Sequence, residues 1–123
     1  QESVKIAKAA GVPDENIILD PGIGFAKDYV DNLRVMNRLE EIVALDYPVL
    51  LGTSRKSMIG KTLNLPPDQL LEGTIATVVF GIAKGCRIVR VHDVAPVKKA
   101  VQMADRMMMP DAFSADVERT AAP

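Results

Sequence analysis

The sequence has no tryptophan, one histidine and one cysteine among its 123 residues, and only 4% of it is aromatic. The lone cysteine, Cys86, excludes an internal disulfide, and one histidine with one cysteine cannot complete a zinc site. We interpret Cys86 as a small buried residue of a protein in a reducing compartment, the cytoplasm. The few aromatic residues argue against a base-stacking surface, and a net charge of -1 gives no general attraction to nucleic acid or to an anionic membrane.

Long apolar runs are also missing. No run approaches the roughly 20 residues needed to cross a bilayer, and the first residues lack the basic and apolar segments of a signal peptide. The motifs HExxH, CxxC and GxSxG do not occur, so these metalloprotease, redox and hydrolase signatures are missing. Because the chain starts without methionine and enters a helical pattern almost at once, we interpret it as a piece of a longer protein or as a processed chain.

The spacing of apolar residues predicts alternating helices and strands. Apolar runs at 17–19 and 49–51 are too short for helices and predict buried strands, and the stretch 88–93 is the third predicted strand. Helical spacing predicts helices over 3–10, 28–46, about 68–84, and from Pro96 to 107 or 108, while 57–65 is a loop that can hold a short helix. Since each strand is followed by a helix, we predict an α/β fold of parallel βα repeats.

Polar and charged residues stand at the carboxyl ends of all three predicted strands. They are Asp20, the Ser54-Arg55-Lys56 group, and Arg90 with His92. Right-handed crossovers place the ends of parallel strands at one edge of a sheet, and ligands bind at that edge in barrels and open α/β sheets. We therefore expect these residues to converge on one site.

Alternation of side chains along a strand puts Arg90 and His92 on the same face. A buried cation and imidazole need an anionic partner. One interpretation is a structural ion pair with an Asp or Glu. The other is an oxyanion site, in which the guanidinium fork binds phosphate and the imidazole adds a donor.

The same alternation divides the group after the second strand. Ser54 and Lys56 share a side with Gly52, whose missing side chain leaves room for a flat ligand, and Arg55 points elsewhere, towards the mouth of the site. A solvated basic loop is the alternative interpretation of Arg55 and Lys56.

Asp20 and Phe25 bound the loop after the first strand. The Asp20 carboxylate either neutralises the neighbouring cations or accepts hydrogen bonds from a heterocycle edge that is rich in N–H donors. Phe25 packs either on a ligand ring or under the loop. The glycines of this loop do not complete the GxGxxG pattern of dinucleotide-binding proteins.

Three motifs together resemble dihydropteroate synthases, a family of pterin-binding enzymes. The motifs are Asp20-Pro21-Gly22-Ile23-Gly24-Phe25, Gly52-Thr53-Ser54-Arg55-Lys56-Ser57 and Arg90-Val91-His92-Asp93-Val94. The resemblance covers residues 1 to about 108. It implies a TIM (β/α)8 barrel, of which residues 1–110 correspond to the last three strands, an incomplete barrel followed by a loosely ordered tail over 111–123.

The resemblance also implies an activity and site roles. Family members condense a 6-hydroxymethyl-7,8-dihydropterin pyrophosphate with p-aminobenzoate, release pyrophosphate, and are targets of sulfonamides. By resemblance, Asp20 and Lys56 bind the pterin and Arg90 and His92 bind the pyrophosphate. Ser54, Arg55 and Phe25 lie at the p-aminobenzoate site. Mg²⁺ is the implied cofactor, with its ligands outside this chain, and no covalent nucleophile is implied.

The length of the chain limits what the resemblance implies. A (β/α)8 barrel needs at least about 200 residues, so we expect the 123-residue chain alone to lack catalytic competence. Three strands leave an apolar sheet edge exposed, so we expect the chain to self-associate as a homo-oligomer or to be joined to the remainder of a longer protein.

Two other functions are compatible with the sequence. One is the pterin-binding domain of a folate-dependent methyltransferase, although the Ser54-Arg55-Lys56 group and the Arg90 and His92 pair favour the synthase. The other is a non-catalytic half-barrel that acts as an assembly module.

Overall fold

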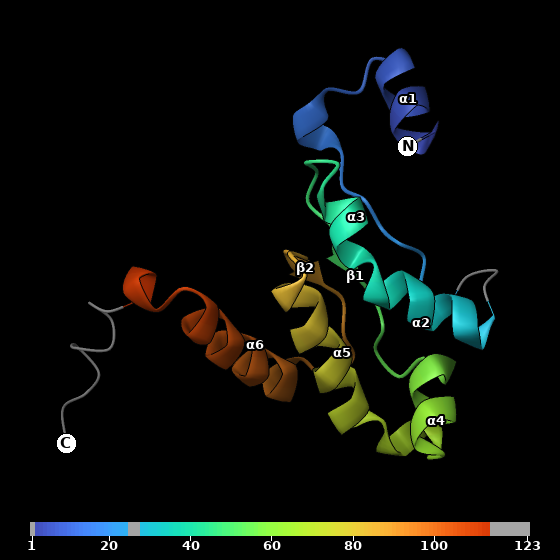
Figure 1. The fold of residues 1–123 in the computed structure, drawn as a ribbon, viewed down its shortest axis with the longest axis vertical. Coiled ribbons are helices and arrows are strands. Elements are labelled where there is room, and N and C mark those ends of the chain that lie inside the picture. Colours follow the sequence, from blue (N-terminus) through green and yellow to red (C-terminus); the bar gives the residue numbers. More distant parts are fainter. Residues whose placement is uncertain (1, 25–27, 114–123) are drawn as a thin grey trace.

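The computed structural model describes residues 2–24 and 28–113, and its fold is shown in Figure 1. Its α-helices are α1 (Glu2–Ala9), α2 (Tyr29–Asn37), α3 (Leu39–Val43), α4 (Ser57–Leu63), α5 (Leu71–Ala83) and α6 (Val94–Met108). Short 3₁₀ helices are η1 (Asp14–Asn16), η2 (Pro67–Gln69) and η3 (Pro110–Phe113), and the strands are β1 (Leu50–Leu51) and β2 (Ile88–Val89). Most of the tail expected over 111–123 lies outside the described residues.

The strands form a small parallel sheet. Leu50 pairs with Ile88 and Leu51 with Val89, while Leu19 makes an isolated parallel bridge to Val49 on the other side of β1. The Leu50 N–H donates to Leu19 O at 2.8 Å. Three parallel segments therefore lie in the order of the sequence, with β1 in the middle, and the α/β class with parallel strands is confirmed.

The strands are shorter than the apolar runs predict. The run 17–19 is not a regular strand, because Leu19 bridges Val49 alone and Ile18 is 56% exposed. The run 88–93 is a strand only as far as Val89. A strand needs a neighbouring segment to form hydrogen bonds with. Strand β1 ends at Leu51, and the chain then turns away into the loop that leads to α4. The predicted strand over 90–93 is therefore wrong, although the direction of its side chains is informative.

The helix predicted over 28–46 is instead two helices. The chain breaks at Arg38, whose φ of -111° and ψ of 21° leave the helical region, and α3 begins at Leu39. The Arg38 N–H is shared between Arg34 O and Val35 O, both at 3.1 Å. The start is as predicted, since Asp28 is the N-cap of α2 and accepts from the Asp31 N–H at 2.8 Å. The break keeps Met36 and Leu39 both buried.

The later helices agree with the sequence to within a turn. The predicted segment 68–84 begins as η2 and becomes α5 at Leu71. Gly85, at a φ of +110°, follows its end as the spacing predicts. Helix α6 begins at Val94 rather than at Pro96. Pro96 is still in the first turn, where its missing N–H leaves no helical bond unmade. The loop predicted over 57–65 contains α4.

The core lies between the sheet and the helices that cover it. In Figure 1, α5 lies between α6 on one side and α2 with α4 on the other. Cys86 is buried, as predicted, and its burial raises the pKa of its thiol, which disfavours a nucleophilic thiolate. The cluster of buried apolar residues consists of Ile23, Met36, Leu39, Val49, Leu51, Met58, Ile59, Leu70 and Cys86.

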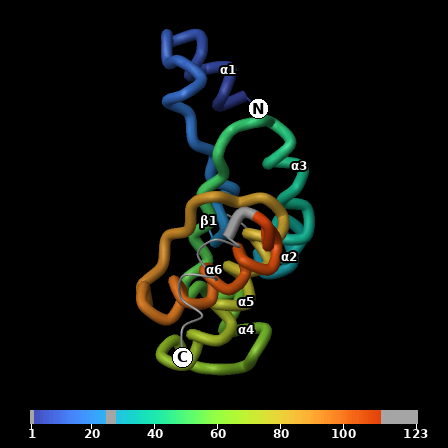
Figure 2. Tube along the Cα trace, turned by 90° about the vertical axis from the view of Figure 1, so that its left-hand side faces the viewer, coloured from blue at the N-terminus to red at the C-terminus, as the bar shows by residue number. Residues whose placement is uncertain are grey.

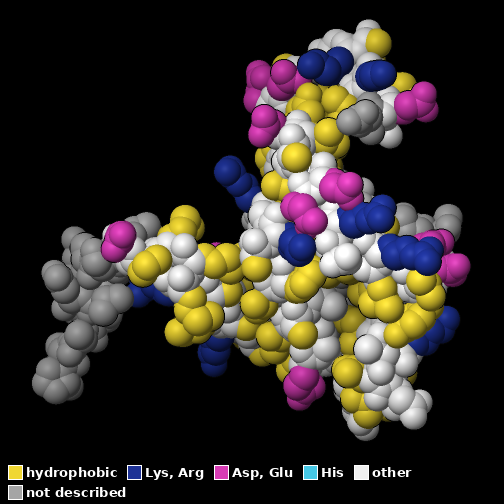
Figure 3. All heavy atoms as spheres, in the orientation of Figure 1, with side chains coloured by type: hydrophobic (Ala, Val, Ile, Leu, Met, Phe, Trp, Pro, Cys, Tyr) yellow, Lys and Arg dark blue, Asp and Glu magenta, His cyan; other side chains and the backbone are white. Residues whose placement is uncertain are grey.

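Parts of the apolar surface are uncovered. Helix α1 has no buried residue and stands away from the remainder of the fold in both Figure 1 and Figure 2. Figure 3 shows apolar side chains along the projecting part of α6, where Met103 is 59% and Met107 63% exposed. The expected exposed edge appears as an apolar groove of about 480 Å³ beside β2 and α6. None of the helices within 2–24 and 28–113 is long and apolar enough to cross a membrane.

Candidate active site

A pocket of about 370 Å³ opens where β1 and β2 end, at their carboxyl ends. It is lined by Gly52, Ser54, Lys56, Arg90, Val91 and His92. The alternation along the two chain segments predicts five of these residues on one side, and the structure brings those five together. Val91, which alternation assigns to the other face, also contributes to the wall. The expected convergence is therefore seen for Ser54, Lys56, Arg90 and His92, and not for Asp20 or Arg55, which do not line the pocket.

Arg90 lies over the backbone of Gly52. Its Nη2 and Nε atoms are 3.6 and 3.8 Å from the position that a Cβ would occupy on Gly52. The space that the missing side chain was expected to leave for a flat ligand is thus partly covered by the guanidinium. Arg90 is also one of the residues that line the pocket.

Lys56 connects the pocket to the loop that follows Leu19. Its ammonium donates to Ile23 O, and its Cδ lies 2.9 Å from the position of a Cβ on Gly24. Burial lowers the pKa of Lys56 below its ordinary value, and the positive charge of Arg90 acts in the same direction. The negative charge of Asp20 opposes both. Lys56 is therefore electrostatically coupled to Asp20 and to Arg90.

Asp20 is not among the residues that line the pocket. It is exposed, and its Oδ1 accepts from the Gly22 N–H at 2.8 Å, which closes the turn after Leu19. Its link to the pocket is its negative charge, which acts to raise the pKa of Lys56. Phe25, the other residue predicted in this loop, lies outside the described residues.

Ser54 and His92 are paired by two hydrogen bonds. Ser54 Oγ lies 2.8 Å from His92 Nδ1, and the backbone N–H of His92 donates to the same oxygen at 3.0 Å. Ser54 is only 6% exposed. The hydroxyl thus faces the imidazole rather than the centre of the pocket.

Arg55 does not line the pocket, as predicted, although its segment is a turn rather than the extended chain that the prediction assumed. Its side chain makes a two-point ion pair with Asp93, with Nη2 2.8 Å from Oδ1 and Nε 3.3 Å from Oδ2. Its backbone has a φ of +55°, and its N–H donates to Thr74 Oγ1 at 3.2 Å. Arg55 is exposed, in agreement with the solvated-loop interpretation, and its side chain is also held by a specific partner.

Two supporting groups were not identified from the sequence as part of the site. Asn32, buried in α2, accepts from the Gly24 N–H at 3.0 Å and holds the loop on which Lys56 rests. Thr53 Oγ1 lies 2.7 Å from Thr77 Oγ1, which in turn donates to Thr74 O at 2.8 Å. The two threonines one turn apart in the apolar stripe of α5 are the sequence signal that could have indicated a polar contact to the neighbouring loop.

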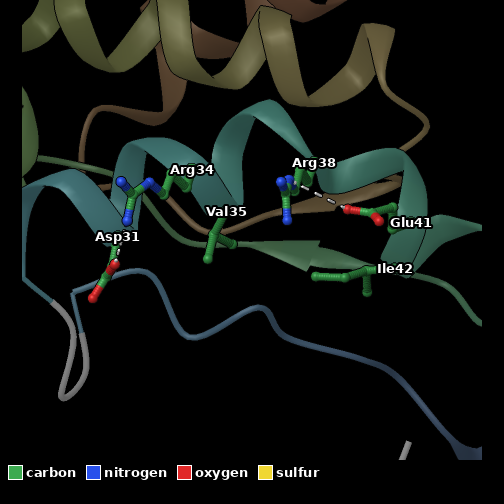
Figure 4. A pocket seen from close by; sticks show the side chains of 6 residues that line it. All are labelled: Asp31, Arg34, Val35, Arg38, Glu41 and Ile42. Carbon is green, nitrogen blue, oxygen red and sulfur yellow. Dashed lines mark hydrogen bonds and ion pairs between the residues drawn. The ribbon is translucent and has the colours of Figure 1, made fainter.

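A second hollow lies on the outside of α2 and α3 and lacks the chemistry of the first. Figure 4 shows its lining, which includes Val35 and Ile42 and the Arg38 and Glu41 pair, 3.9 Å apart. Two acidic and two basic side chains, Asp31, Arg34, Arg38 and Glu41, line this hollow, so their charges balance. Among the described residues, no group of three or more His, Cys, Asp or Glu side chains could hold a metal ion.

The first pocket gathers nitrogen-bearing side chains at its wall. Lys56, Arg90 and His92 line the same space, together with Ser54 and Gly52. Donors of this kind stabilise a phosphate group, or negative charge that develops on a leaving group.

Comparison with known proteins identifies related sequences. The family described as "Pterin binding enzyme" matches residues 1–92. A dihydropteroate synthase of Bacillus subtilis is 63% identical over 107 residues, which are 87% of this chain and 38% of that protein. One of Clostridium beijerinckii is 61% identical over 106 residues, which are 85% of this chain and 39% of that protein. The chain thus spans less than half the length of these curated relatives.

Solved structures of the same group superpose closely. A dihydropteroate synthase of Clostridium difficile, crystallised in the presence of pteroic acid, has a TM-score of 0.83 and 53% identity, and the match covers 86% of this chain and 40% of that one. A dihydropteroate synthase of Coxiella burnetii in complex with pteroic acid has a TM-score of 0.86 and 42% identity, with 90% and 42% covered.

Proposed function

Because this chain belongs to the pterin-binding enzyme family, we propose that it is part of a dihydropteroate synthase, a transferase of folate biosynthesis. The chain contributes the last three strands of a (β/α)8 barrel and part of its active site. The observation that carries the proposal is the convergence of Lys56, Arg90 and His92 on one pocket at the carboxyl end of parallel strands.

The substrates proposed are a 6-hydroxymethyl-7,8-dihydropterin pyrophosphate and p-aminobenzoate. Arg90 and His92 bind the pyrophosphate, because they present donors on one side of the pocket. Lys56 and Asp20 bind the pterin. Asp20 is exposed and acceptor-only when ionised, which suits the N–H-rich edge of a pterin ring.

Ser54, Arg55 and Phe25 border the proposed p-aminobenzoate site. For Arg55, the proposal concerns its loop rather than its guanidinium, since the fork is paired with Asp93. Ser54 contributes less directly, because its hydroxyl faces His92.

The reaction is a displacement at the pterin methylene carbon. The amine nitrogen of p-aminobenzoate forms a bond to that carbon, the bond to the pyrophosphate oxygen breaks, and the electron pair leaves with pyrophosphate. The amine proton is released to solvent. Negative charge increases on the leaving group in the transition state, so the cations already placed beside it lower the barrier. The chemistry requires no covalent nucleophile from this chain.

In this proposal, Mg²⁺ is bound by groups outside the described residues. The described residues contain no acidic or imidazole cluster that would hold it. No step described above depends on the ion.

The remaining strands of the barrel are the proposed occupant of the apolar groove beside β2 and α6. The groove is lined by Leu50, Ile88, Val89, Arg90, Val91, Val94, Val97, Lys98 and Val101. The relatives are more than twice as long as their matched segments, so they contain enough further chain to cover it. We expect the isolated chain to form homo-oligomers through this face when that partner is missing, which light scattering would detect.

Ligand binding by the 123-residue chain tests the proposed function. In calorimetry, the chain is expected to bind inorganic pyrophosphate, and to bind p-aminobenzoate or a sulfonamide when pyrophosphate is present. Chromatography of a reaction mixture is expected to show no dihydropteroate, because most of the barrel is missing. Sustained product formation would show that the incomplete-barrel proposal is wrong.

The same experiment separates the alternatives. A pterin-binding methyltransferase domain would bind a pterin but neither p-aminobenzoate nor a sulfonamide. A non-catalytic assembly module would be oligomeric and would bind none of these ligands. Either outcome would contradict the synthase proposal.

The pH dependence of pyrophosphate binding should depend on Lys56. Burial lowers the pKa of Lys56. Its ammonium therefore starts to lose its proton at a lower pH than that of an ordinary lysine. A bound anion favours the ammonium, so affinity should fall as the pH rises through the lowered pKa, and binding in that range should take up a proton. Calorimetry in buffers of different ionisation enthalpy would measure this uptake.

Lys56→Arg is the matched variant for this test. The guanidinium of the variant stays charged over the whole pH range. The decrease in pyrophosphate affinity with rising pH that deprotonation of Lys56 causes should therefore disappear. The ionisation of pyrophosphate itself is common to both proteins and cancels in the comparison. Identical pH profiles for the two proteins would contradict the role of Lys56.

A further inference from the structure

The Ser54 hydroxyl is placed where it can select the protonation of the imidazole. We propose that Ser54 is a positioning residue, which holds His92 in the tautomer that carries its proton on Nε2 and directs that N–H into the anion pocket. The inference rests on the proposed function only for the identity of the anion. Its observations are the two hydrogen bonds between Ser54 Oγ and His92, at 2.8 and 3.0 Å.

The direction of these bonds follows from counting donors. The backbone N–H of His92 can only donate, so Ser54 Oγ accepts there. Among the described residues, the Ser54 hydroxyl has no acceptor for its own proton other than His92 Nδ1. Ser54 is 6% exposed, and a buried hydroxyl with no acceptor is costly. The hydroxyl therefore donates to Nδ1, and a neutral ring that accepts at Nδ1 carries its proton on Nε2.

Ser54 is the fixed member of the pair, because both of its neighbours are attached to α5. Thr53 is fully buried and its hydroxyl lies 2.7 Å from Thr77 Oγ1. The Arg55 N–H donates to Thr74 Oγ1 at 3.2 Å. These contacts hold the serine without help from the imidazole.

His92 lacks such support from its own strand. Strand β2 ends at Val89, and His92 is exposed. Its backbone N–H donates to Ser54, and the next residue, Asp93, is paired with Arg55. Ser54 and Arg55, in the loop after β1, thus contact His92 and Asp93, in the segment after β2. The ring orientation of His92 is set by the loop after β1 rather than by the sheet.

The functional consequence concerns the Nε2 atom. His92 lines the pocket with Arg90 and Lys56, and Nδ1 is occupied by Ser54, so Nε2 is the ring nitrogen available to a ligand. With its proton there, the neutral ring donates to an anion. In the other tautomer Nε2 would present a lone pair to the anion and repel it. Ser54 therefore converts a histidine that can accept or donate into a donor.

Nitrogen NMR of the histidine tests the inference directly. The sequence contains a single histidine, so its ring signals need no assignment among others. In long-range ¹H–¹⁵N spectra at about pH 8, where an ordinary imidazole is neutral, we expect Nε2 to have the shift of a protonated nitrogen and Nδ1 that of an acceptor. A wild-type ring protonated on Nδ1, or an equal mixture of tautomers, would overturn the inference.

Ser54→Ala should change both the ring and the binding. The variant should show a mixture of tautomers and bind inorganic pyrophosphate about fivefold more weakly, the effect of one hydrogen bond of ordinary net strength. Ser57→Ala is the matched control, because it removes an exposed hydroxyl from the same segment. The control should keep the wild-type spectrum and affinity. An unchanged tautomer in Ser54→Ala would refute the positioning role.

The two readouts separate this inference from the proposed function. The wild-type tautomer is measured without any ligand, so it decides the role of Ser54 alone. If wild-type protein shows the Nε2-protonated ring and fails to bind pyrophosphate, the proposed function is wrong and the positioning role stands.

Discussion

Arg90→Ala is expected to weaken the binding of inorganic pyrophosphate about 100-fold, because it removes charge-assisted hydrogen bonds from a planar fork that no neighbour can replace. The guanidinium lies over Gly52, with Nη2 3.6 Å from the position of a Cβ there, so it is already placed before a ligand arrives. Lys56 and His92 remain in the variant but contribute single donors from other directions. Calorimetric titration of the variant beside the wild type measures the loss.

Arg87→Ala is the control for that experiment. Arg87 is an exposed residue of the same charge, three positions earlier in the chain, and does not line the pocket. Its loss should leave the affinity within about twofold, since an exposed charge at a distance is screened by salt. Equal losses in the two variants would show that net charge, rather than the geometry at Arg90, governs binding.

Leu51→Ala is expected to reduce the free energy of unfolding by about 3 kcal/mol, the usual cost of truncating a fully buried leucine. Leu51 is 0% exposed and belongs to β1, at the centre of the parallel segments. Gly81→Ala is expected to cost about 2 kcal/mol, since its Cβ would lie 2.3 Å from Leu51 Cδ2. Urea unfolding followed by circular dichroism measures both changes.

The double variant is the more informative measurement. Removing the Leu51 side chain makes room for the Cβ at position 81, so Leu51→Ala with Gly81→Ala should cost little more than Leu51→Ala alone. Leu33→Ala, at a leucine that is 39% exposed, is the control and should cost less than about 1 kcal/mol. Additive losses at positions 51 and 81 would contradict the close approach of α5 to β1.

Local features of the fold could be read from the sequence because their causes are local. The cap of α2 depends on Asp28 and a backbone N–H three residues away, and the left-handed turn at Gly85 depends on the missing side chain of that residue. Alternation of side chains predicted one direction for Ser54 and Lys56 and another for Arg55, and the structure has this arrangement, although residues 54 and 55 form a turn and the Arg55 φ is +55°. The turn, in which the Lys56 N–H donates to Thr53 O at 3.1 Å, sets these directions in the folded chain.

The lengths of the strands and the break at Arg38 could not be predicted in this way. A strand exists only where a neighbouring segment runs beside it, and the apolar run at 88–93 continues past the point where β1 has turned away. The long apolar stripe over 28–46 likewise does not reveal that Leu39 enters the core from a new helix. Both outcomes depend on contacts between distant segments.

The cationic stretch after β1, which ends at Lys56, shows what the sequence determined by itself. Residue types and their order predict that Lys56, Arg90 and His92 meet at one edge of the sheet, because parallel strands with right-handed crossovers must bring their ends together. Only the tertiary structure paired Ser54 with His92 and Arg55 with Asp93, partners that are 38 positions apart in the chain. Such pairs depend on the register of β1 against β2 and on the rotamers that packing on α5 allows, and neither is encoded in a local pattern.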